Sequence, residues 1–265
     1  MPDSDDTAPP QQDGFIEAGG HRLEYRLIGR LDPARPALVF LHEGLGCIAM
    51  WRGFPARIAQ AAGLPALVYS RHGYGKSDPL TEPRSSRFMH DEAAVALPAV
   101  LRAFGITQPI LIGHSDGASI ALIHAGLFPD GTRAAAVMAP HLFVEQLCID
   151  EIARAAQQYL GTDMRARLAR YHDDVDGAFH GWADVWLSPD FPAWTIEAEV
   201  AASRCPILAI QGWQDQYGTM RQIDRIAELR PDARLLKLDD CRHSPHLDRH
   251  DEVLAAIVSF VAASA

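Results

Sequence analysis

The sequence LIGHSDG at residues 111–117 places one serine between two glycines, directly after an apolar run. The residues that follow, 118–122, are typical of the start of a helix. A G-x-S-x-G pattern between a strand and a helix predicts a sharp turn that pushes the serine hydroxyl out of a sheet. The flanking glycines let neighbouring backbones approach closely. We therefore predict that Ser115 is a nucleophile, and the alternative is a serine that only caps a buried helix.

Short apolar runs alternate with helical segments along most of the chain. Strands are expected at 37–41, 64–70, 109–112, 134–138, 206–211 and 234–238, and helices at 51–62, 91–104 and 251–262. A glycine pair at 19–20 between two short β-prone runs predicts a hairpin. Wholly apolar strands suit a parallel sheet that is buried on both faces. The alternation predicts an α/β fold with helices on both faces of a mostly parallel sheet of about eight strands.

The pattern changes at the two places where we divide the chain. Residues 1–13 are acidic and contain proline, and we expect a disordered tail there. Residues 141–203 are rich in helix formers and tryptophan and carry no strand pattern, which predicts a helical cap inserted into the core. The core would then comprise residues 14–140 and 204–265.

Composition narrows the possible partners. The chain has 265 residues, 48% of them hydrophobic, and a formal net charge of -10 at pH 7. This charge argues against nucleic acid or an anionic membrane as the main partner and favours a small-molecule substrate. No apolar stretch approaches the ~18 residues of a membrane span, and the first residues do not resemble a secretory signal. We expect a cytoplasmic protein, monomeric or homodimeric, without cofactor.

Four scattered cysteines form no short-spaced pair, so reduced thiols are expected. The histidines His243, His246 and His250 do not predict a metal site, because a proline separates the first two and no helix places all three on one face.

A serine hydroxyl needs a base to take its proton, and a histidine is suited to that role. A carboxylate should orient the imidazole and stabilise its charged form. Asp215 and His243 each lie just past the end of a predicted strand, at the sheet edge where ligands bind in open parallel sheets. The other candidates near these positions are Asp239, Asp240, His246 and His250.

The negative charge that develops on the substrate oxygen needs preorganised N–H donors. The residue after the nucleophile, Asp116, should supply one. Gly44 in the loop after the strand at 37–41 should supply the other, with its neighbour Leu45 as the alternative. Six residues are candidates for the substrate pocket or the loops around it: His42, Glu43, Tyr74, Trp182, Trp186 and Tyr217. For His42 and for His72, a buried histidine that fixes its loop is the favoured interpretation.

Four motifs together resemble the α/β-hydrolase superfamily, in particular its small esterase and C–C-hydrolase-like branch with a helical cap. They are LHEG at 41–44, SRHGYGKS at 70–77, GHSDG at 113–117 and CRH at 241–243. The resemblance implies an α/β-hydrolase fold and the roles of nucleophile, acid and base for Ser115, Asp215 and His243. Glu43 and Asp116 depart from the family's usual residues, which are a glycine and an uncharged residue.

These observations predict a cofactor-free serine hydrolase that cleaves an ester, thioester or lactone through an acyl-serine intermediate. Two alternatives stay open at this point. One keeps the fold and hydrolyses or lyses a C–C bond, and the other is a non-catalytic binder of a small molecule under the cap.

Overall fold

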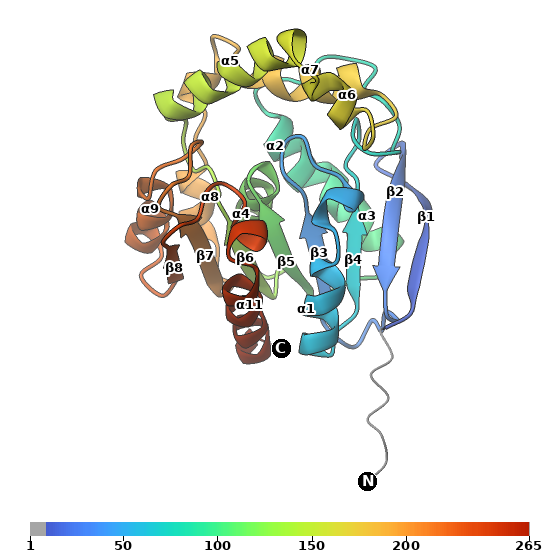
Figure 1. Ribbon diagram of the computed structural model, residues 1–265. Helices are drawn as coiled ribbons and strands as arrows, with labels where there is room; N and C mark the ends of the chain where they lie inside the picture. The colour runs from blue at the N-terminus through green and yellow to red at the C-terminus, as the bar shows by residue number, and fades with distance from the viewer. Residues whose placement is uncertain (1–8, 265) are drawn as a thin grey trace.

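The computed structural model describes residues 9–264, which form a single sheet with helices on both faces and a helical layer above one edge (Figure 1). The eight-stranded sheet has the order β1-β2-β4-β3-β5-β6-β7-β8. Strands β1 and β2 form an antiparallel hairpin, β2 pairs antiparallel with β4, and the remaining neighbours are parallel. The strands are β1 Gln11–Ala18, β2 His21–Ile28, β3 Ala37–Leu41, β4 Ala66–Tyr69, β5 Pro109–His114, β6 Ala134–Met138, β7 Ile207–Gly212 and β8 Arg234–Leu238.

The helices fill the connections between these strands, as the alternation in the sequence predicts. The helical segments are η1 Ile48–Trp51, α1 Phe54–Ala62, α2 Phe88–Asp91, η2 Glu92–Ala96, α3 Leu97–Ala103, α4 Asp116–Leu127, α5 Gln146–Gly161, α6 Met164–Leu168, α7 Val175–Trp186, η3 Phe191–Ala193, α8 Glu197–Ala202, α9 Arg221–Leu229, α10 Pro245–Asp248 and α11 His250–Ser264. The α/β-hydrolase fold expected from the motifs is confirmed.

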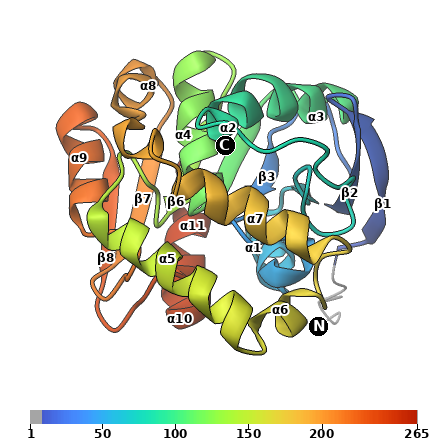
Figure 2. The same cartoon turned by 90° about the horizontal axis from the view of Figure 1, so that it is seen from above.

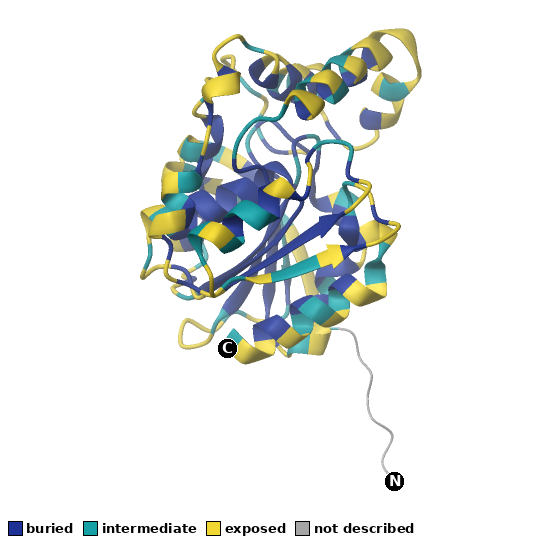
Figure 3. Cartoon of the chain, turned by 90° about the vertical axis from the view of Figure 1, so that its left-hand side faces the viewer, coloured by how far each residue is buried: buried dark blue, intermediate teal, exposed yellow. Residues whose placement is uncertain are grey.

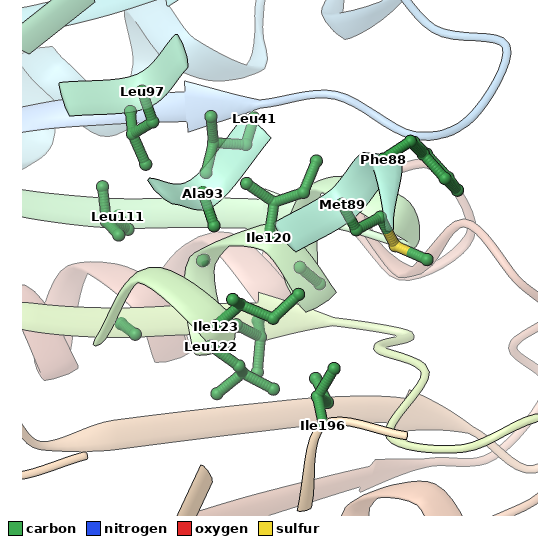
Figure 4. Packing of buried hydrophobic residues seen from close by; sticks show 14 of the residues in the cluster. Leu41, Phe88, Met89, Ala93, Leu97, Leu111, Ile120, Leu122, Ile123 and Ile196 are labelled. Carbon is green, nitrogen blue, oxygen red and sulfur yellow. The ribbon is translucent and has the colours of Figure 1, made fainter. Parts of the chain in front are cut away.

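The central strands are buried on both faces, which explains why their sequences are continuous apolar runs (Figure 3). On one face, Leu38 and Phe40 of β3 pack with residues of α1 and α11. On the other face, Leu41 and Leu111 pack with Ile120 of α4 and with α2, as Figure 4 shows. Helix α4 is thereby enclosed between the sheet and the helices outside it, so its position is fixed from several sides.

The hairpin between β1 and β2 forms where the sequence predicts it. Gly19 and Gly20 have φ angles of 63° and 86°, which a two-residue turn of this kind requires and which side chains disfavour. The start of β1 corrects one expectation, because residues 11–13 are in the strand and not in a disordered tail. Residues 9 and 10 precede the strand, and the carbonyl of Pro10 accepts a hydrogen bond from the N–H of Gly29 at 2.8 Å. Residues 1–8 of the expected tail lie outside the described residues.

The expected cap region divides into two parts in the structure. Helices α5, α6 and α7 lie above the carboxyl ends of the parallel strands, and α5 and α7 run across the sheet when it is seen from above (Figure 2). Helix α8 instead packs on α4 in the core, so the expected cap of 141–203 extends too far. The chain leaves and re-enters the core side by side, because Phe143 and Thr195 form an antiparallel bridge.

None of the helices within residues 9–264 combines the length and apolar character needed to cross a membrane.

The four cysteines Cys47, Cys148, Cys205 and Cys241 are buried and unpaired, which agrees with the expected reduced thiols.

Helix α8 approaches α4 closely at Gly126, where an added Cβ would collide with the backbone of Glu199. We therefore expect Gly126→Ala to lower the free energy of unfolding by about 1–3 kcal/mol, because neither backbone can yield without disturbing the core. The measurement is equilibrium unfolding in urea. Gly161→Ala in α5 is the matched control, since a Cβ there meets nothing within 4 Å. Equal stability of the two variants would contradict the close approach.

Candidate active site

Ser115 occupies the turn between β5 and α4 with a backbone that is unusual for a residue other than glycine. Its φ and ψ are 52° and -121°, and its N–H donates to the carbonyl of Met138 at 2.9 Å. The turn is possible because the residues at 113 and 117 are glycines. A Cβ at Gly113 would lie 2.6 Å from the Cα of Ala118, and a Cβ at Gly117 would collide with the backbone of Leu41. The two glycines of the motif are thus required by packing, and the serine hydroxyl is held at the end of the central strand.

His243 and Asp215 meet Ser115 at this edge of the sheet. His243 follows β8 and places its Nε2 2.9 Å from the Oγ of Ser115. Asp215 follows β7, and its two carboxylate oxygens lie 2.8 and 2.9 Å from the Nδ1 of His243. Three residues that are remote in the sequence therefore form one continuous hydrogen-bonded row.

Asp215 is surrounded by donors that favour its charged form. Its carboxylate accepts hydrogen bonds from the backbone N–H of Tyr217 at 2.8 Å and from Nε2 of Gln211 at 2.7 Å. Burial alone would raise the pKa of Asp215, but His243 and the Tyr217 N–H hold that pKa below its usual value. Asp215 is therefore an ionised partner that fixes the ring orientation of His243.

The other candidates for acid and base do not reach the serine. Asp239 and Asp240 are exposed beyond β8. His246 is buried against Trp51, and His250 accompanies it near Phe54 on the α1 side. Within the described part of the chain, no group of three or more histidine, cysteine or acidic residues is arranged to hold a metal ion.

A cavity of about 260 Å³ opens onto the Ser115 hydroxyl between the sheet edge and the cap. Of the residues singled out in the sequence, those that line it are Glu43, Gly44, Ser115, Asp116, Trp182, Trp186, Tyr217 and His243. Leu45, the neighbour of Gly44, also lines it. Sequence reasoning missed the other lining residues, which are Met50, His114, His141, Cys148, Ile152, Met164, Leu168 and Ser244. The i, i+4 spacing of Cys148 and Ile152 on α5, and of Met164 and Leu168 on α6, is a signal in the sequence that could have indicated shared faces.

Gly44 and Asp116, the two residues expected to supply backbone donors, line the same cavity as Ser115. Asp116 is the first residue of α4, so its N–H has no acceptor within the helix. Gly44 lies in the loop after β3, and a Cβ there would collide with the indole of Trp182. The absence of a side chain at position 44 therefore lets the cap approach this loop.

His42 and Tyr74 were expected at the pocket, but neither residue lines it. His42 is buried; its Nε2 accepts from the backbone N–H of Arg71 at 3.0 Å, and its Nδ1 donates to the carbonyl of Glu43 at 2.7 Å. Burial lowers the pKa of His42 and keeps the ring neutral, which this pair of bonds requires. Tyr74 packs edge-on against the His42 ring. His72 also contacts its own loop, because its Nε2 donates to the carbonyl of Pro79 at 3.0 Å, but it is half-buried and not buried as expected.

Glu43 forms a second carboxylate–histidine pair next to the first. Its Oε2 lies 3.4 Å from Nδ1 of His114, and Nε2 of His114 donates to the carbonyl of His243 at 2.7 Å. Burial lowers the pKa of His114, but Glu43 outweighs that effect and the pKa is raised. Burial likewise raises the pKa of Glu43, and His114 brings it far below its usual value. The pair ties the loop of Gly44 to the segment that carries His243.

This pair predicts a pH-dependent contribution to stability. Because the pKa of Glu43 is lowered in the folded state, the stability that Glu43 contributes is lost as the pH falls through its folded-state pKa. Because the pKa of His114 is raised in the folded state, the stability that His114 contributes is lost as the pH rises through its folded-state pKa. We expect Glu43→Gln to lower the unfolding free energy by about 1–3 kcal/mol, most strongly between about pH 4.3 and 6.5.

Urea unfolding at several pH values measures this difference, and the exposed Glu82→Gln serves as the control. A deficit of Glu43→Gln that stays constant from pH 3 to pH 9 would show that the ion pair is not its origin.

Comparison with known proteins places these residues in context. Residues 38–256 match the model of the alpha/beta hydrolase family. The chain is 26% identical to the N-formylmaleamate deformylase of Pseudomonas putida, over 94% of this chain and 96% of that one, and 22% identical to an sn-1-specific diacylglycerol lipase of Mus musculus, over 91% and 85%. Its fold is similar to the crystal structure of the enol-lactonase from Burkholderia xenovorans, with a TM-score of 0.73, 19% identity and coverage of 94% and 99%.

Proposed function

The chain belongs to the alpha/beta hydrolase family, and we propose that it is a serine hydrolase that cleaves an ester, thioester or lactone of a small molecule. The observation that carries this proposal is the row from Asp215 through His243 to Ser115, with distances of 2.8 and 2.9 Å, at the floor of a cavity. Such a row is the arrangement that turns a hydroxyl into a nucleophile at neutral pH.

The proposed reaction runs in two halves. In the first, Oγ of Ser115 attacks the substrate carbonyl while Nε2 of His243 takes its proton, and Asp215 stabilises the resulting imidazolium. The backbone N–H groups of Gly44 and Asp116 hold the oxyanion of the tetrahedral intermediate. When the intermediate collapses, the bond to the alcohol or thiol breaks, His243 returns the proton to that leaving group, and an acyl-serine remains.

In the second half, water attacks the acyl-serine carbonyl and His243 takes a proton from it. The new tetrahedral intermediate uses the same two N–H donors, because its oxyanion occupies the same position. Collapse breaks the bond to Ser115, whose Oγ recovers the proton from His243, and the carboxylic acid leaves. No cofactor takes part in either half of this scheme.

The test of the nucleophile is Ser115→Ala. We expect it to lower kcat for a short-chain p-nitrophenyl ester by about 10⁶-fold, because the covalent route is lost. The same variant should lose labelling by a fluorophosphonate probe. Ser188→Ala, at the end of α7 and outside the cavity, should retain both activities. Turnover by purified Ser115→Ala at the wild-type rate would refute the serine mechanism.

Asp215→Asn isolates the orienting role of the carboxylate. The amide has nearly the same shape but can present its NH₂ to His243 and favour the wrong tautomer, so we expect kcat to fall by about 10⁴-fold with KM little changed. Steady-state kinetics on the same ester measure both constants. A fall of less than tenfold would mean that Asp215 does not act through His243.

The name of the deformylase relative motivates a second candidate reaction, hydrolysis of a C–N bond. The same intermediates serve an amide, provided that His243 protonates the leaving nitrogen. Parallel assays of matched esters, N-formyl amides and diketones distinguish ester, C–N and C–C cleavage. Turnover of the diketone alone would favour C–C hydrolysis, and failure of the fluorophosphonate to label Ser115 would favour a non-catalytic binder.

A further inference from the structure

The backbone carbonyl of Glu43 accepts hydrogen bonds from three donors. Nδ1 of His42 lies 2.7 Å from this oxygen, Nη2 of Arg71 lies 3.0 Å from it, and the backbone nitrogen of Gly46 lies 3.1 Å from it. The bond from Gly46 closes a four-residue turn whose second residue is Gly44. The direction of the Glu43 carbonyl is therefore fixed by three separate bonds.

This carbonyl also sets the direction of the N–H of Gly44, because both groups belong to one peptide unit. That unit is planar and trans, so its C=O and its N–H point in opposite directions. The carbonyl points toward the buried side chains of His42 and Arg71, and the N–H therefore points away from them. Gly44 lines the cavity that contains Ser115, and its N–H has no acceptor within residues 9–264. This N–H is thus free to donate to a substrate.

Arg71 differs from the other two donors because it is charged. Its side chain is 0% exposed, and within the described part of the chain it forms no salt bridge. Its Nη2 donates to the carbonyls of Glu43 at 3.0 Å and His42 at 3.4 Å, while its Nε and Nη1 have no partner among these residues. A buried cation costs free energy unless its surroundings compensate it. The compensation that this cation finds through hydrogen bonds comes from the loop that carries Gly44.

A cation bound to the carbonyl of a peptide unit polarises the N–H on the other side of that unit. Charge-assisted hydrogen bonds are the stronger ones, and linked hydrogen bonds strengthen one another where the dielectric is low. In the proposed reaction the Gly44 N–H binds the oxyanion, so its orientation and its strength as a donor both affect the transition state.

We propose that Arg71 is a positioning residue, which orients and polarises the N–H of Gly44 through the carbonyl of Glu43. Arg71 itself does not line the cavity, so it acts on the substrate only through this peptide unit. The inference rests on the proposed hydrolase function and adds to it a residue outside the reactive row.

The kinetic test uses Arg71→Met and Arg71→Lys. Methionine keeps much of the side-chain length without a charge or a donor, whereas lysine keeps both. We expect Arg71→Met to lower kcat and kcat/KM for p-nitrophenyl butyrate by the same factor, about 10-fold to 100-fold, because the lost interaction belongs to the transition state. Arg71→Lys should recover part of this loss. Wild-type kcat in Arg71→Met would overturn the proposal, and equal losses in both variants would contradict a role for the charge.

Arg84→Met is the matched control. The guanidinium carbons of Arg71 and Arg84 both lie 4.8 Å from the centre of the Tyr74 ring, but Nη2 of Arg84 donates to the carbonyl of His72 and not to that of Glu43. We therefore expect Arg84→Met to keep kcat and KM near the wild-type values. A loss as large as that of Arg71→Met would show that any nearby cation has the same effect, and the assigned contact would be wrong.

A spectroscopic measurement tests the contact without turnover. Residues 43 and 44 are the one Glu-Gly pair in the sequence. Protein made by cell-free synthesis with ¹³C in the glutamate carbonyls and ¹⁵N in the glycines therefore gives a single signal in an HNCO spectrum. In Arg71→Met we expect the carbonyl carbon of Glu43 and the amide proton of Gly44 to move upfield, because a donor and its charge are lost. In Arg84→Met both shifts should stay as in the wild type.

This spectrum also separates the inference from the hydrolase function. An unchanged signal in Arg71→Met would refute the role of Arg71, even in an enzyme that hydrolyses esters. If the wild type turns over no ester and takes no fluorophosphonate label, the hydrolase proposal fails, and the spectrum still decides whether Arg71 controls the Gly44 amide.

Discussion

The left-handed backbone of Ser115 is the constraint on which the rest of the site depends. Such a conformation costs on the order of 1–3 kcal/mol in a residue with a side chain, so its surroundings must enforce it. Here β5 ends in the middle of the sheet, the N–H of Ser115 is held by β6, and α4 is packed on all sides. The glycines at 113 and 117 allow the contacts that keep the turn closed. The position of the Ser115 hydroxyl therefore depends on both the order of the strands and the packing of α4.

Three carboxyl groups lie around this serine, and the donors near each one account for their different states. Asp215 accepts several hydrogen bonds and Glu43 has His114 beside it, so both have a lowered pKa. Asp116 is almost completely buried beside Trp186, and burial outweighs the effect of its neighbours and raises its pKa. Distance from the nucleophile does not explain the difference, because Asp116 is adjacent to Ser115 in the chain. The balance between burial, which raises the pKa of a carboxyl group, and nearby donors, which lower it, explains the difference.

Much of this arrangement could be predicted from the sequence, because it follows from where strands end. The G-x-S-x-G motif identified Ser115, the positions shortly after two later strands identified Asp215 and His243, and the parallel sheet brings all three to one edge. The walls of the cavity could not be predicted as well. Tyr74 and Cys148 are both compatible with packing or with lining, and the direction of a side chain depends on the cap above it. Helix α8 was assigned to the cap for a similar reason: its composition does not reveal that Gly126 accommodates it against α4.

The bridge between Phe143 and Thr195 has a consequence for how such a protein diversifies. The two ends of the intervening segment are adjacent in space, so its chain leaves and re-enters the core at one place, and His172 adds a second contact with the core through Gly75 and Leu45. A replacement of different length or sequence needs to match that narrow stem and to supply a substitute for the contacts of His172. Recombination or engineering at these two positions could thus supply new specificities while the strands beneath, and the reactive groups on them, keep their places.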